Sequence, residues 1–143
     1  FILMIRHRKL PANIEDLIPK AVTYLQSVPD ILFAYLFGSF GRGKHFPLSD
    51  VDIAIYLKEP TVVQEKRMEI IGALIDILQT DEIDLVVLNS APLPLRMRIL
   101  ENKKVIVDSE PFVRHHYESL TMREYFDFSI LERGILNRRF LGG

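Results

Sequence analysis

Residues 50–57 alternate between two kinds of side chain, and this alternation constrains the fold more than any other segment of the chain. One face of the segment is apolar and consists of Val51, Ile53, Ile55 and Leu57. The other face carries Asp50, Asp52, Ala54 and Tyr56. Alternation with a period of two predicts a β-strand with one face in the core. A continuous apolar segment, Ile31–Phe37, precedes it and ends at Gly38, as is typical of a buried strand.

The remaining pattern predicts helices and strands in alternation. Asn13 is expected to cap a first helix, in which Pro19 delays the regular part until about Leu17. Thr61 and Gln64 form a capping box for a second helix. Further on we expect a strand over 83–88, a short helix over 92–101, a strand over 105–107 and a long helix from about residue 109.

Composition excludes several classes of function. The chain has 143 residues, enough for one domain, and 48% of them are hydrophobic. A formal net charge of −1 removes any compositional case for binding nucleic acid. The absence of cysteine excludes disulfides, cysteine-ligated zinc and thiol nucleophiles, and fits a cytoplasmic protein. No apolar segment is long enough to span a membrane, which takes about 20 residues.

Three acidic residues form a candidate metal site. Asp50 and Asp52 are two residues apart on a strand, so both carboxylates project from one face. Two like charges this close repel each other unless a cation neutralises them. Asp84 lies between Ile83 and Leu85 in the next predicted strand, where a charge is unexpected. If the two strands are neighbours, the three carboxylates suit Mg²⁺, and two ions about 3.5–4 Å apart could serve an in-line displacement.

The turn after the first strand is a candidate phosphate site. Gly38 allows backbone angles that other residues avoid, and free amides there, with the Ser39 hydroxyl, can bind phosphate oxygens. Arg42 is expected to add positive charge to the same candidate phosphate turn. Residues 38–44 also spell the start of a P-loop, but His45 stands where the loop needs Ser or Thr, so we reject that interpretation.

Gly38-Ser39, followed after ten residues by Asp50-Val51-Asp52, resembles the signature of polymerase-beta-type nucleotidyltransferases. It is most similar to the minimal (MNT) branch, which includes antitoxins paired with HEPN-domain toxins. The resemblance implies an α+β fold with a mixed sheet flanked by helices and a C-terminal helical tail. It also implies that Gly38 and Ser39 bind nucleotide phosphates, that Asp50 and Asp52 bind Mg²⁺, and that Asp84 helps to bind metal and to activate the attacking hydroxyl.

The function implied by this resemblance is adenylyl transfer. Such antitoxins move AMP from ATP to a tyrosine of a HEPN ribonuclease toxin, as in a type VII-like toxin–antitoxin system. Two alternatives stay open: a non-catalytic antitoxin that neutralises its partner by occlusion, and a small-molecule nucleotidyltransferase of the aminoglycoside-modifying kind.

The chain is expected to divide into a catalytic region, 1–108, and a C-terminal helical tail, 109–143. The first region uses most of the sequence and leaves little for a second, substrate-binding domain. The tail is rich in aromatic and aliphatic residues over much of its helical surface, which predicts either additional core or a surface for a partner protein. The shortage of sequence favours a protein acceptor.

Overall fold

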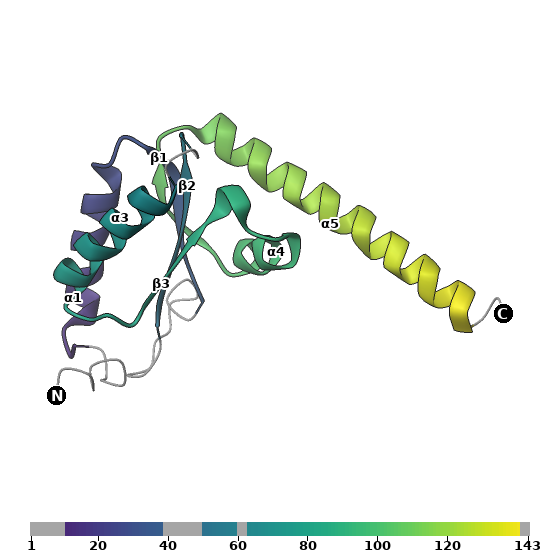
Figure 1. Ribbon diagram of the computed structural model, residues 1–143, viewed down its shortest axis with the longest axis horizontal. Helices are drawn as coiled ribbons and strands as arrows, with labels where there is room; N and C mark the ends of the chain where they lie inside the picture. The colour runs from purple at the N-terminus through teal and green to yellow at the C-terminus, as the bar shows by residue number, and fades with distance from the viewer. Residues whose placement is uncertain (1–10, 39–49, 60–62, 141–143) are drawn as a thin grey trace.

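The computed structural model describes residues 11–38, 50–59 and 63–140, with helices on both faces of one β-sheet (Figure 1). The elements are α1 (Ile14–Gln26), β1 (Ile31–Phe37), β2 (Val51–Leu57), α3 (Val63–Leu78), β3 (Ile83–Val87), a 3₁₀ turn (Leu88–Ser90), α4 (Leu93–Glu101), β4 (Lys104–Asp108) and α5 (Pro111–Phe140). The predicted strands and helices are therefore all present, with ends shifted by a few residues. The capping box predicted at Thr61 lies outside the described residues.

The sheet is mixed and has the strand order β3-β2-β1-β4. β1 is antiparallel to both of its neighbours, β2 and β4. β2 and β3 are parallel, and α3 supplies the crossover that two parallel strands require. This arrangement confirms the α+β class and makes β2 and β3, which carry the predicted acids, direct neighbours.

α1 and α3 cover one face of the sheet (Figure 1). α1 places Ile14, Leu17, Ala21 and Leu25 in the core, and α3 places Ile70, Leu74 and Leu78 there. They pack against the apolar face of β2 predicted from its alternation. Burial of side chains of this size contributes about 1.5–3 kcal/mol each, so this face supplies much of the stability.

The start of α1 differs from the prediction. The helix is regular from Ile14 and contains Pro19, which is exposed, instead of beginning near Leu17. Burial of four apolar side chains on the opposite side outweighs the cost of about 3 kcal/mol for an internal proline. Asn13 makes no side-chain capping bond; its backbone carbonyl accepts the amides of Asp16 and Leu17 instead.

The other face of the sheet is covered by α4 and the first turns of α5. Its core is aromatic: Phe33 stacks on Tyr56 with ring centroids 4.8 Å apart, and Tyr117 of α5 meets Tyr56 edge-on at 5.3 Å. The Tyr117 hydroxyl donates a hydrogen bond of 2.8 Å to the carbonyl of Leu88. Tyr56 is thus a packing residue of this core.

A polar cluster holds the first half of α5 against the sheet. The buried Glu118 accepts hydrogen bonds from the Tyr35 hydroxyl at 2.6 Å and from Arg114 at 3.1 Å. Arg114 also binds both carboxylate oxygens of Asp108, at 2.8 and 3.1 Å. The predicted tail is therefore divided: its first half joins the core.

The second half of α5 extends away from the sheet beyond α4 (Figure 1). Its large apolar side chains are exposed: Met122, Tyr125, Phe126, Phe128, Ile130, Leu131 and Ile135. We call residues 122–135 the distal segment of α5. In the described part of the chain, no helix is both long and apolar enough to cross a membrane.

Candidate active site

The sheet brings the predicted acids together through its strand register. Asp52 of β2 pairs directly with Asp84 of the parallel strand β3, and on its other side Asp52 pairs with Phe37, the last residue of β1. Gly38 follows Phe37, so the glycine turn begins beside Asp52. One end of the sheet therefore carries two of the predicted carboxylates and the first residue of the predicted phosphate turn.

Gly38 is required at its position for two separate reasons. Its backbone has φ = +67°, in the left-handed region that residues with a Cβ occupy at a cost of roughly 1–2 kcal/mol. A Cβ on Gly38 would also overlap the Oδ2 atom of Asp52. The glycine thus lets the chain turn away from β1 while the Asp52 carboxylate lies directly against its backbone.

A pocket of about 260 Å³ opens at this end of the sheet. Its walls are Phe37, Gly38, Asp52, Asp84, Arg98 and Asn102. The first four belong to the sheet and the turn, and the last two come from the end of α4. Acidic groups on the sheet thus face a basic group on a helix.

The electrostatics of the pocket centre on Asp52. Burial, then the nearby charge of Asp84 and that of Asp50, raise the pKa of the half-buried Asp52 to about 6, and Arg98 acts in the opposite direction. Repulsion between carboxylates is the effect expected where a cation is normally present. The negative charges of Asp84 and Asp50 therefore raise the pKa of Asp52, and the positive charge of Arg98 offsets part of this effect.

The remaining predicted site residues are placed as follows. Asp50 is exposed and directly precedes β2; it does not line the pocket but is close enough to affect Asp52. Ser39 and Arg42 lie outside the described residues. Of the predicted residues, the structure brings together Gly38, Asp52 and Asp84.

The donor set suits a hard divalent cation. Mg²⁺ is commonly held by one or two carboxylates, with phosphate and water completing its shell, and Asp52 and Asp84 supply two carboxylates in one pocket. Within the described ranges no group of three or more His, Cys, Asp or Glu residues is arranged to hold a metal ion alone. A Mg²⁺ ion held by these two carboxylates would take its other ligands from phosphate and water.

Sequence reasoning missed Arg98 and Asn102. Both belong to α4, which is remote from β2 along the chain, and nothing in their local pattern marks them. The only signal was that Arg96 and Arg98 are two residues apart and so point to different sides of a helix. The structure shows that Arg96 binds Glu124 and Thr121 of α5, while Arg98 lines the acidic pocket.

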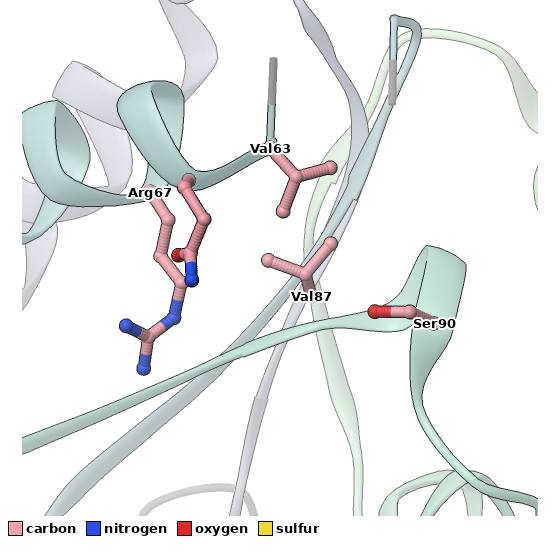
Figure 2. A pocket seen from close by; sticks show the side chains of 5 residues that line it. Val63, Arg67, Val87 and Ser90 are labelled. Atoms are coloured by element: carbon pink, nitrogen blue, oxygen red, sulfur yellow. The ribbon is translucent and has the colours of Figure 1, made fainter. Parts of the chain in front are cut away.

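A second pocket, of about 320 Å³, lies between α3 and β3 and carries no acid (Figure 2). Val63 and Val87 point toward one another there, while the Arg67 guanidinium points away from both. The Nε atom of Arg67 donates to the carbonyl of Leu85 at 3.2 Å, so Arg67 covers part of the open edge of β3. This pocket lacks the carboxylates that the predicted chemistry needs.

Comparison with known proteins agrees with this geometry. The chain belongs to the polymerase beta nucleotidyltransferase family, whose sequence model matches residues 19–112. A search of curated protein sequences found no significant match.

Solved structures with a similar fold come from toxin–antitoxin pairs. A mutant of the MntA–HpeT pair matches with 26% identity and a TM-score of 0.66, over 86% of this chain and 94% of the other. A toxin–antitoxin structure with AMP-PNP matches with 26% identity and a TM-score of 0.67, over 86% and 95%. The tri-AMPylated Shewanella oneidensis HEPN toxin in complex with MNT antitoxin matches with 24% identity and a TM-score of 0.62, over 87% and 94%. The expected fold and family are thus confirmed.

Proposed function

We propose that this chain is a Mg²⁺-dependent adenylyltransferase that acts as an antitoxin by transferring AMP from ATP to a tyrosine of a HEPN ribonuclease toxin. The observation that carries the proposal is the direct pairing of Asp52 with Asp84 beside Gly38 in a nucleotidyltransferase fold. Similar structures of toxin–antitoxin pairs, one of them with AMP-PNP, support both the partner class and the nucleotide.

The transfer forms one bond and breaks one bond. The tyrosine oxygen of the partner attacks the α-phosphorus of ATP, and the bond from that phosphorus to the oxygen bridging to the β-phosphate breaks, so pyrophosphate leaves. Asp84 accepts the hydroxyl proton and passes it to water. Asp50, Asp52 and Asp84 would hold Mg²⁺, which would neutralise phosphate charge. The turn at Gly38 and Ser39, with Arg42, binds the phosphates.

The test is labelling of the co-expressed toxin with ATP labelled at the α-phosphate. Wild-type protein with Mg²⁺ should label the toxin, and Asp52→Asn should reduce labelling by at least 100-fold. Asp76→Asn removes an exposed carboxylate from α3, remote from the pocket, and should label like the wild type. Equal labelling by wild type and Asp52→Asn would contradict the proposal.

The division into residues 1–108 and 109–143 is part of the same proposal, with the distal segment of α5 as the partner-binding surface. Phe128, Leu131 and Ile135 are spaced by three and four residues, so they share one side of the helix. That side continues the row by which Val113, Tyr117 and Thr121 pack on the domain. An apolar row that continues along a helix and stays exposed is a suitable surface for a helical partner. Structures of similar fold also come from two-protein pairs.

The exposed distal segment also favours the second candidate function, neutralisation by occlusion. Here binding alone would silence the toxin. The double variant Asp52→Asn/Asp84→Asn tests catalysis, and a chain ending at Asp127 tests docking. Full neutralisation by the double variant, with none by the shortened chain, would favour occlusion; loss of neutralisation in both would favour adenylyl transfer.

A third possibility, transfer to a small molecule, would be supported by labelling of an aminoglycoside without any partner protein.

A further inference from the structure

Arg98 is the basic side chain that faces the paired acids. It lies in the last turn of α4 and lines the same pocket as Asp52 and Asp84. Arg98 reaches this pocket because α4 packs over the aromatic face of the sheet and the C-terminal end of α4 lies at the end of the sheet that carries Asp52.

Two neighbouring basic residues, Arg96 and Lys103, bind structural partners, whereas Arg98 has no such partner among the described residues. Arg96 binds Glu124 at 3.2 Å, and Lys103 lies 3.8 Å from Glu118. Among the residues that the structure describes, no hydrogen bond or ion pair is made by the Arg98 side chain, which is exposed. Its guanidinium is therefore available to a ligand that enters the pocket.

A role in helix stability alone does not explain the placement. A cation in the last turn of a helix gains about 0.3–1 kcal/mol from the helix dipole, wherever on the turn it points. That gain does not require a position opposite two carboxylates. A guanidinium can bind two oxygens of a phosphate at once, and a phosphate bound beside Asp52 and Asp84 is the ligand that would bring negative charge to this wall.

We propose that Arg98 binds a phosphate group of the nucleoside triphosphate, on the wall of the pocket opposite Asp52 and Asp84. The inference rests on the proposed nucleotide-transfer function and adds a binding residue from α4 to it. Without nucleotide, Arg98 offsets the carboxylates; with nucleotide, it pairs with phosphate. Removing its charge therefore has opposite effects on the two ligands: nucleotide binds more weakly, and a divalent metal alone binds at least as well.

The experiment measures binding of AMP-PNP in the presence of Mg²⁺ and binding of Mn²⁺ alone, on the full chain. Arg98→Gln should weaken AMP-PNP at least tenfold, Arg98→Lys should recover part of the loss, and Mn²⁺ should bind Arg98→Gln as well as or better than wild type. Arg138→Gln is the matched control, since Arg138 is exposed on α5 and does not line the pocket; it should stay within twofold of wild type.

Two results would overturn the inference while leaving the proposed function intact. One is AMP-PNP affinity of Arg98→Gln within twofold of wild type. The other is parallel loss of AMP-PNP and Mn²⁺ affinity, which indicates a distorted pocket and not a lost phosphate contact. Absence of AMP-PNP binding by the wild type would instead overturn the proposed function, and the role of Arg98 with it.

Discussion

At the scale of single residues, Gly38 and Asp52 depend on each other. The carboxylate of Asp52 lies against the backbone of Gly38, in space that any larger residue would fill. The half-buried carboxylate has room at the end of the sheet because glycine is the residue that follows β1. The position of the Asp52 carboxylate thus depends on the backbone of Gly38.

Gly38→Ala should destabilise the protein and displace Asp52. We expect the free energy of unfolding to fall by about 2 kcal/mol, from the unfavourable φ and the overlap with the carboxylate. Urea denaturation measures this change. Gly72→Ala is the control: a Cβ on this helical glycine would contact nothing, so the variant should be unchanged or more stable by about 0.5–1 kcal/mol. Equal effects of the two substitutions would contradict the argument.

Asp52→Asn should stabilise the metal-free protein at neutral pH and not at acid pH. Because the folded-state pKa is raised from 3.8 to about 6, the unfolded chain releases the proton first, and wild-type stability falls as pH rises between those values. After allowance for solvent screening we expect a gain of about 1 kcal/mol at pH 7.5.

The measurement is urea denaturation of wild type and Asp52→Asn with EDTA at pH 4 and pH 7.5. Excess Mg²⁺ should stabilise the wild type more than the variant at pH 7.5. A stability difference that does not change with pH would show that the substitution does not relieve the cost of the Asp52 charge, which comes first from burial and then from the neighbouring acids.

At the scale of elements, α5 is attached to the sheet by charge as well as by apolar packing. Glu118 is buried and lies between the Tyr35 hydroxyl and two basic side chains, Arg114 and Lys103. A buried carboxylate is tolerated only with such partners. The first half of α5 is therefore held against the sheet.

Glu118→Ala should loosen this attachment. Loss of the carboxylate leaves Arg114 partly buried with one acid fewer, so we expect the free energy of unfolding to fall by about 3 kcal/mol in urea denaturation. Glu132→Ala, on the exposed distal segment of the same helix, should change it by less than about 0.5 kcal/mol. An effect of similar size at both positions would show that α5 is not held through Glu118.

At the scale of the whole molecule, the distal segment of α5 contributes little to the fold. Its apolar side chains remain exposed, Phe126 by 63% and Leu131 by 60%. Because they bury little surface, they stabilise the isolated chain little. Exposure of large apolar side chains to water is unfavourable, and it is typical of a surface that a partner covers.

A chain ending at Asp127 should therefore retain its stability and lose its partner. The shortened protein keeps the contact between Arg96 and Glu124, so we expect its free energy of unfolding to stay within about 0.5 kcal/mol of the full chain. Co-purification with the toxin should fall sharply. Leu131→Asp in the full chain is a milder test of the same surface, and Arg133→Asp is its neighbouring control. Retained binding by the shortened chain would exclude residues 128–135 of the distal segment as the docking surface.

Local pattern was sufficient to predict the elements and two of the acids. The alternation of residues 50–57 depends on a period of two, which assigns Asp52 and Val51 to opposite faces without knowledge of the fold. The pairing of Asp52 with Asp84 was a conditional prediction, since it required that two strands be neighbours. Pro19 was misjudged because a local penalty was weighed without the core burial that offsets it.

Asp52, Asp84 and Gly38 were thus recognisable from the sequence by itself, because residue type and short-range spacing carry strand faces, turn preferences and charge repulsion. Only the tertiary structure placed Arg98 opposite the acids and separated the docked half of α5 from its exposed half. Those facts depend on how α4 and α5 pack on the sheet, and such packing joins residues that are distant along the chain. In α5 the apolar side chains are spread around the helix among charged ones, so its sequence does not itself show where the domain that covers it ends.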